Sequence, residues 1–286
     1  MAETQDILGE GPVWSADDQR LYWFDIKGSR LNWLAPADGS RGAFALPARG
    51  SVAVPHIEGG LVLVTEAGLG RLDTGSGDFR LVRSLALPEG FRTNDGKIDV
   101  RGRIWWSTMD DDGGRRPGAL HRTDPDGRTR RILDGLHIAN TVSCNPEGDV
   151  LYLADSAAGV IWSCFMRPDG SLDERRPFVD LSGEPGAPDG SAVDEEGCLW
   201  NAQWGLSRVV RYRPDGSVER IIPLPVTQVT SCAFGGPGLS TLYITSAREG
   251  LDEAALVAQP LAGSLFALDA GVAGLDLPPF AGRLAP

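Results

Sequence analysis

The sequence has little basic charge and no long apolar run. It carries 27 Lys and Arg against 39 Asp and Glu, a net charge of −12, so it lacks the positive surface that nucleic acids and anionic membranes attract. No stretch is apolar enough to cross a bilayer, and the acidic start at residues 1–6 is not followed by the apolar segment of a signal peptide. We therefore expect a cytoplasmic protein without nucleic-acid or membrane partners, and its oligomeric state stays open.

Cysteine and histidine are also scarce. The four cysteines form no CxxC pair, and three of them lie in or beside apolar strands, which predicts buried free thiols. Of the three histidines, His121 is expected on a surface strand and His137 in a loop near the site. Because the histidines share no position in the repeat described next, a histidine-rich zinc site is not expected.

Glycine (37) and proline (20) are abundant, which favours short strands and turns over long helices. A turn rich in Asp, Glu and Gly, followed by an apolar strand, recurs six times. The strands begin at residues 21, 61, 104, 151, 199 and 242, at intervals of 40 to 48 residues. That is the spacing of four-stranded blades, so the sequence predicts an all-β protein: one six-bladed β-propeller domain over residues 1–286. An irregular β-sandwich would share the turns but not the regular interval.

Polar residues recur at one position of this repeat. Ten or eleven residues before four of the strands stand Glu10, Asn94, Asn140 and Asp189. Each alone is typical of a turn. In a propeller, however, equivalent positions converge on the central channel, and we expect these residues in the loops that lead into the innermost strands.

Carboxylates crowded into one channel would repel each other unless a cation lay between them. Two carboxylates with amide oxygens suit a hard divalent cation. We expect calcium first, with Zn²⁺, Mn²⁺, Mg²⁺ or Fe²⁺ as alternatives.

These residues lie in motifs that resemble the SMP-30/gluconolactonase family, which includes regucalcin-like proteins and bacterial sugar-lactone lactonases. The matching segments span almost the whole chain: residues 8–14 (LGEGPVW), 92–97 (RTNDGK), Asn140 with 145–148 (NPEG), 188–190 (PDG) and 230–237 (TSCAFGGP). The resemblance implies a metal-dependent hydrolase that opens a sugar lactone to the open-chain sugar acid.

Roles follow from the resemblance position by position. It implies that Glu10, Asn140 and Asp189 are metal ligands and that Asp189 is also the catalytic acid or base. Arg92 and Asn94 would bind the substrate, with Asn94 near the water shell of the metal. Some family members place a substrate-binding Glu shortly before the equivalent of Gly118, whereas this chain has residues 112–117 (DGGRRP) there. The identity of the sugar therefore stays open.

Other interpretations remain. Asp95 is a candidate for supporting the site. Trp105, Trp106, Trp200 and Trp204 are expected mostly in the core, with one or two able to stack on a sugar. The same ring of residues could bind calcium in a regulatory or structural propeller without catalysis, or it could hydrolyse other esters. Three direct protein ligands would leave open metal positions, which favours an enzyme.

Overall fold

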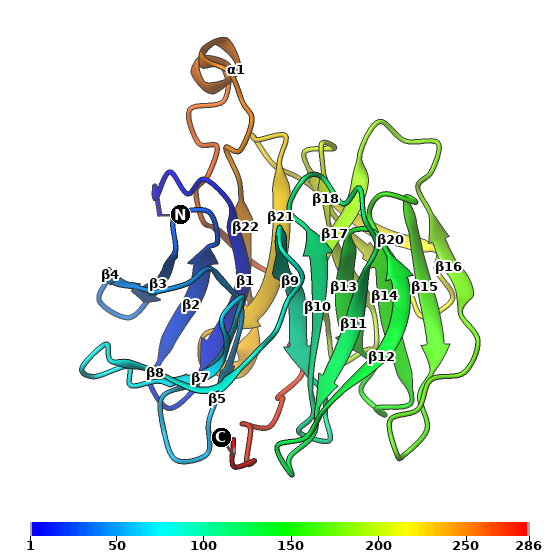
Figure 1. Cartoon of the computed structure of the whole chain (residues 1–286). Helices are drawn as coiled ribbons and strands as arrows, with labels where there is room; N and C mark the ends of the chain where they lie inside the picture. Colours follow the sequence, from blue (N-terminus) through cyan, green and yellow to red (C-terminus); the bar gives the residue numbers. More distant parts are fainter. Residues whose placement is uncertain (1, 285–286) are drawn as a thin grey trace.

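The computed structural model describes residues 2–284, and its β-strands form six antiparallel sheets that radiate from a central channel (Figure 1). This confirms the predicted six-bladed β-propeller. Five sheets have four strands, and the sixth is assigned three, β21-β22-β23. Among residues 2–284, no helix is long and apolar enough to cross a membrane.

Each blade runs outward from the channel in chain order. The innermost strands are β1 Gly9–Ser15, β5 Gly50–Pro55, β9 Phe91–Ile98, β13 Ala139–Cys144, β17 Ala187–Val193 and β21 Val229–Gly235. The second strands are β2 Arg20–Asp25, β6 Leu61–Thr65, β10 Ile104–Asp110, β14 Val150–Asp155, β18 Leu199–Trp204 and β22 Thr241–Ser246.

The outer half of each blade is more exposed. The third strands are β3 Arg30–Ala35, β7 Gly68–Leu72, β11 Gly118–Thr123, β15 Val160–Phe165, β19 Arg208–Tyr212 and β23 Phe266–Asp269. The fourth strands are β4 Ser40–Ala45, β8 Phe79–Ser84, β12 Thr129–Leu136, β16 Arg176–Asp180 and β20 Val218–Pro223. Two short helices complete the described chain, η1 Pro237–Leu239 and α1 Glu253–Ala258.

One detail of the sequence prediction was wrong. The strands that begin near residues 21, 61, 104, 151, 199 and 242 are the second strands, and the polar residues lie on the innermost strands rather than in loops before them. The register of each innermost strand against its neighbour shifts at this point, as between Glu10 and Val13 and between Asn140 and Ser143. Such bulges turn a side chain toward the channel although the strand continues.

Two residues show why the local sequence allows these bulges. Gly11 has φ of +55°, and a Cβ there would lie 2.3 Å from the carbonyl oxygen of Ser51 on the next innermost strand. Thr141 also has a positive φ, +62°, and its Oγ1 donates a 2.6 Å hydrogen bond to the carbonyl oxygen of Asp189. The bulge of one strand is therefore bonded to the next strand around the channel.

The hydrophobic core consists of separate clusters that lie between the blades. Six apolar clusters each join two neighbouring blades. Trp105, Trp106 and Trp200 are fully buried in these clusters, as predicted. All four cysteines are buried free thiols, also as predicted. His121 lies on β11 as expected, but it is half-buried and stacks on Trp106. Burial, and then the charge of Arg131, lowers the pKa of His121 to about 4.

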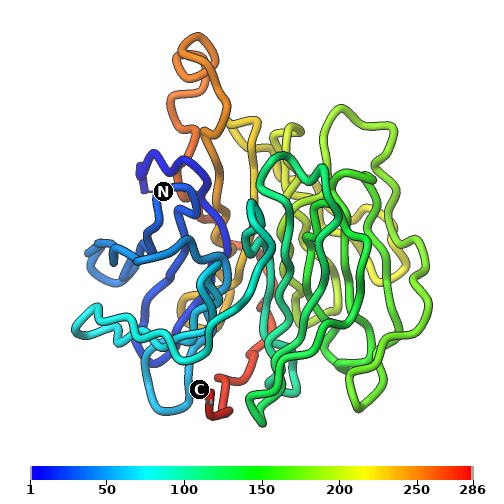
Figure 2. The backbone as a smooth tube through the Cα atoms, in the orientation of Figure 1, coloured from blue at the N-terminus to red at the C-terminus, as the bar shows by residue number. Residues whose placement is uncertain are grey.

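The two ends of the described chain pair with different blades of the propeller. Near the N-terminus, Ala2 pairs with Leu265 just before β23, and the backbone N–H of Asp6 donates to Gly263. Near the C-terminus, the segment 274–280 pairs with Asp194 of the fifth blade and His56 of the second, so it crosses one end of the channel. Figure 2 follows this segment along the lower side of the molecule, while α1 projects at the upper side.

Candidate metal and substrate site

The predicted residues Glu10, Arg92, Asn94, Asn140 and Asp189 line one cavity of about 360 Å³. They come from four innermost strands, β1, β9, β13 and β17. All five are at most 8% exposed. Their shared position in the repeat, which was the basis of the prediction, thus corresponds to a shared place in the structure.

Hydrogen bonds connect these side chains into a chain along the cavity. Nη1 of Arg92 donates to Oδ1 of Asn94 at 2.6 Å, and Nδ2 of Asn94 donates to Oδ1 of Asn140 at 2.8 Å. Nδ2 of Asn140 donates to Oγ of Ser156 at 2.8 Å, and Ser156 donates to the carbonyl oxygen of Pro188 at 2.6 Å. Since Nδ2 of Asn140 is held by Ser156, its oxygen is oriented toward Asn94 and the cavity.

The two carboxylates lack such partners. Within residues 2–284, the side chain of Glu10 receives a hydrogen bond only from the backbone N–H of Gly11, at 2.9 Å, and the carboxylate of Asp189 has no hydrogen bond from another side chain. Burial and the charge of Asp95 raise the pKa of Glu10 to about 8. Burial, Glu10 and Asp95 raise the pKa of Asp189 well above its usual range. Burial is the largest cause of both shifts, and the neighbouring negative charges add to it.

This donor set fits a hard cation. Two buried carboxylates and the oxygen of Asn140 present oxygen ligands, and a divalent cation would offset the charge that raises both pKa values. No group of three or more His, Cys, Asp or Glu side chains in the described part of the chain is arranged to hold a metal. The set here has two carboxylates completed by an amide, which is a different composition.

Asp95 follows Asn94 on β9 and is 5% exposed. Its Oδ2 accepts a 2.9 Å hydrogen bond from the backbone N–H of Val142, next to the bulge at Thr141. Burial raises the pKa of Asp95. This contact is consistent with the predicted supporting position, because it ties the strand that carries Asn140 to the strand that carries Asn94.

Several cavity residues were not found from the sequence. Lys27, Asp111 and Glu249 supply charged side chains, while Leu8, Met109, Ile138 and Ala187 supply apolar surface. Of the four predicted tryptophans, only Trp204 lines this cavity, and it is half-buried. Asp111 directly precedes the segment 112–117, in which no Glu stands, whereas Asp112 is exposed and pairs with Arg115. His137 lies in a loop beside the site, where Nδ1 contacts the carbonyl oxygen of Gly114.

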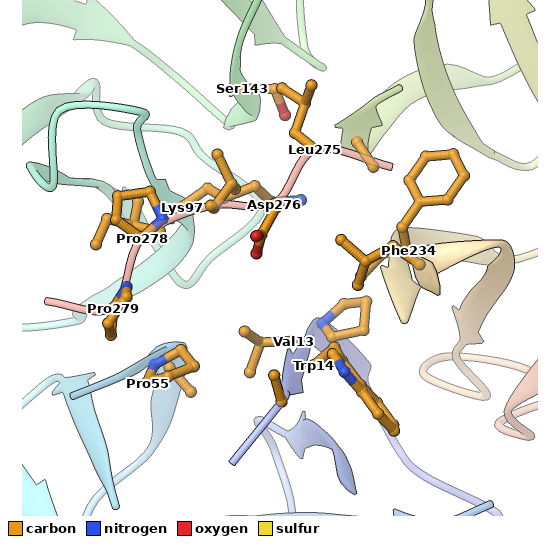
Figure 3. A pocket seen from close by; sticks show the side chains of 18 of the residues that line it. Val13, Trp14, Pro55, Lys97, Ser143, Phe234, Leu275, Asp276, Pro278 and Pro279 are labelled. Carbon is orange, nitrogen blue, oxygen red and sulfur yellow. The ribbon is translucent and has the colours of Figure 1, made fainter. Parts of the chain in front are cut away.

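A second cavity of about 200 Å³ occupies the other end of the channel. Figure 3 shows it between Val13, Trp14, Pro55 and Phe234, with Asp276 of the C-terminal segment pointing into it. Its lining is largely apolar and includes none of the five predicted site residues. The predicted polar site residues therefore lie together in the first cavity, at the opposite end of the channel.

The fold and this site define the class, a six-bladed propeller with carboxylates and amides at one end of its channel. Residues 8–248 match the SMP-30/Gluconolactonase/LRE-like region, and the chain belongs to this family. It is 38% identical to an L-arabinolactonase from Azospirillum brasilense, over 99% of this chain and 95% of that one. It is 37% identical to a 6-deoxy-6-sulfogluconolactonase from Pseudomonas putida, over 96% of each chain.

The fold is also similar to that of a solved structure. The structure of a calcium-binding protein, regucalcin, from Agrobacterium tumefaciens superposes with a TM-score of 0.90 at 32% identity, and the match covers 99% of this chain and 94% of that one.

Proposed function

We propose that this protein hydrolyses a sugar lactone to the open-chain sugar acid with the help of one divalent cation. The observation that carries the proposal is the cavity in which Glu10, Asn140 and Asp189 lie beside Arg92 and Asn94. The lactonase names of full-length relatives support the reaction class. The calcium-binding relative supports a divalent cation, with calcium as the first candidate.

In this proposal Glu10, Asn140 and Asp189 hold the cation. When bound, it polarises the lactone carbonyl and lowers the pKa of a water molecule. Water adds to the carbonyl carbon, the bond from that carbon to the ring oxygen breaks, and the ring oxygen leaves with a proton. The protein must therefore bind the ring, stabilise the oxyanion and move one proton.

In this proposal Arg92 stabilises the oxyanion or binds ring hydroxyl groups. Its Nε is held by Asp111 at 2.7 Å and its Nη1 by Asn94 and the carbonyl oxygen of Thr93. Among the described residues, Nη2 has no hydrogen-bond acceptor, and in this proposal its two N–H groups donate to a substrate oxygen. Trp204 offers the apolar surface on which the ring can rest.

Asp189 carries the proton-transfer role in this proposal. A carboxylate oxygen of Asp189 takes a proton from the attacking water and returns it to the departing ring oxygen. Its buried position keeps the proton from exchanging freely with bulk water. Two contacts to its backbone carbonyl, from Oγ1 of Thr141 and Nδ2 of Asn201, fix the strand that carries it.

A calcium-binding propeller without catalysis is the alternative. The cavity of about 360 Å³ beside the carboxylates favours the enzyme, because a purely structural cation needs no room for a substrate.

The test uses protein freed of metal and assayed on L-arabinono-1,4-lactone and D-glucono-1,5-lactone, with Ca²⁺, Mg²⁺, Mn²⁺, Zn²⁺ or Fe²⁺ added back separately. We expect metal-dependent opening above the spontaneous rate, and a loss of about 100-fold or more in Asp189→Asn. The matched control is Asp276→Asn, which removes a carboxylate from the second cavity and should keep full activity. If no lactone is opened with any metal, the enzyme proposal fails.

A further inference from the structure

The wall of the cavity beside the candidate metal ligands is built from opposite charges. Lys27 in the turn after β2, Arg92 on β9, Asp111 after β10 and Glu249 after β22 all line the cavity. They come from the first, third and sixth blades. Arg49 stands behind Asp111. This charged wall faces the space that a bound substrate would fill.

Every cation of the charged wall is matched by carboxylates. Nζ of Lys27 lies 2.7 Å from Asp111 and 3.2 Å from Glu249. The carboxylate of Asp111 also forms ion pairs with Arg49 and Arg92, each at 2.7 Å. Arg49 makes a second ion pair with Glu66, at 2.7 Å. Burial alone would raise the pKa of Asp111. Hydrogen bonds from Lys27, Arg49 and Arg92 outweigh it and hold this pKa well below its usual range.

Together, the charged wall and the adjoining pair of Arg49 and Glu66 contain three cations and three carboxylates. Their formal charge is therefore zero. Lys27 in particular is contacted from two sides, by Asp111 and Glu249. A sulfonate, phosphate or carboxylate on the substrate would have to displace one of these carboxylates and would be repelled by the other. Hydroxyl groups, which both donate and accept hydrogen bonds, suit such a mixed wall without displacing anything.

We infer that this site selects neutral polyhydroxylated lactones over lactones with an anionic substituent, and that Glu249 is the residue that sets this preference by neutralising Lys27. The inference rests on the proposed function and names its substrate class. Glu249 is the informative position because, among the described residues, its side chain forms an ion pair only with Lys27, while Asp111 orients three cations at once. The backbone carbonyl of Glu249 accepts from Gln228, a contact that a side-chain substitution retains.

The experiment compares kcat/KM for D-glucono-1,5-lactone and for 6-deoxy-6-sulfo-D-glucono-1,5-lactone, in the wild type and in Glu249→Gln. We expect the wild type to prefer the neutral lactone and Glu249→Gln to shift the ratio toward the sulfonated one by about tenfold, since Lys27 then carries an uncompensated charge. The shift should shrink at high ionic strength. The control is Glu253→Gln, the same chemical change on exposed helix α1 outside the cavity, and it should leave the ratio unchanged.

A wild type that prefers the sulfonated lactone, or a Glu249→Gln variant with an unchanged ratio, would overturn the inference while leaving lactone hydrolysis in place. If neither lactone is hydrolysed, the proposed function fails and binding decides the inference by itself. In that arm, calorimetry measures the affinity for 1,5-anhydroglucitol and for its 6-deoxy-6-sulfonate, which have the ring but no lactone to open. Tighter binding of the neutral compound by the wild type, reduced about tenfold relative to the sulfonate in Glu249→Gln, supports the inference, and the reverse order refutes it.

Discussion

The buried carboxylate Glu10 should make the metal-free protein less stable as the pH rises. Its pKa is raised from 4.5 to about 8 in the folded state, by burial and then by the charge of Asp95. Between these two pH values the folded state binds more protons than the unfolded state, so the free energy of unfolding falls as the pH increases. Below pH 4.5 the stability is fully present, and above about pH 8 the loss is complete.

The size of this effect follows from the shift. At about 1.4 kcal/mol for each pH unit between the two pKa values, Glu10 alone corresponds to about 5 kcal/mol, which is an upper bound because buried sites relax. Asp189 acts in the same direction, since its pKa is also raised by burial and by Glu10. A bound cation reverses the situation by stabilising both carboxylates. At a concentration 100 times its Kd it adds about 2.7 kcal/mol.

The assay is urea unfolding followed by tryptophan fluorescence, from pH 5 to pH 9, without metal and with Ca²⁺. Glu10→Gln separates this site from all other titrating groups. Without metal, the variant should match the wild type near pH 5 and exceed its free energy of unfolding by about 2 to 5 kcal/mol at pH 9. The exposed control Glu253→Gln should follow the wild type at every pH. A difference between Glu10→Gln and the wild type that stays constant across this range would refute the reasoning.

Three further predictions concern the residues around the site and the closure of the ring. Asn94→Leu removes the link from Arg92 to Asn140, so calorimetry should show metal affinity reduced about 10- to 100-fold while the fold remains. Gly190→Ala places a Cβ 2.1 Å from Oγ of Ser231, and should lower the free energy of unfolding by about 1 to 3 kcal/mol in urea titrations. Asp6→Ala leaves Trp23 and Asn32 without their buried acceptor, and should cost about 3 kcal/mol by the same measurement, whereas an unchanged midpoint would show that the N-terminal segment contributes little.

The repeat was readable from the sequence because each blade uses the same local chemistry. Turn residues precede an apolar strand in every copy, and the interval predicted six blades correctly. The position of the innermost strand was misread, because strands such as Gly9–Ser15 contain glycine, proline and polar residues and look like loops. Burial in the channel and bulged pairing with the next strand keep such a sequence extended. Neither effect is visible in local propensity.

The ring of Glu10, Asn94, Asn140 and Asp189 was predicted because rotation about the channel converts a common place in the repeat into a common place in space. The charged wall has no such common place in the repeat. Lys27, Asp111 and Glu249 follow second strands, but they occur in only three blades and differ in residue type. In the sequence each resembles an ordinary surface charge, and only the folded chain brings them within ion-pair distance.

This difference separates two layers of the site. The inner residues lie on bulged strands that hydrogen bonds tie to their neighbours, so their arrangement is fixed by the propeller itself, and we expect it to determine the type of reaction. Lys27, Asp111 and Glu249 of the charged wall lie outside the strands, where a change such as Glu249→Gln alters net charge without altering any strand pairing. We therefore expect single substitutions at the wall to change the charge preference for the substrate while the inner carboxylates and amides remain the same. The predicted insensitivity of metal affinity to Glu249→Gln, measured by calorimetry alongside the shifted lactone preference, tests this separation: a large loss of metal affinity in that variant would show that the two layers are not independent.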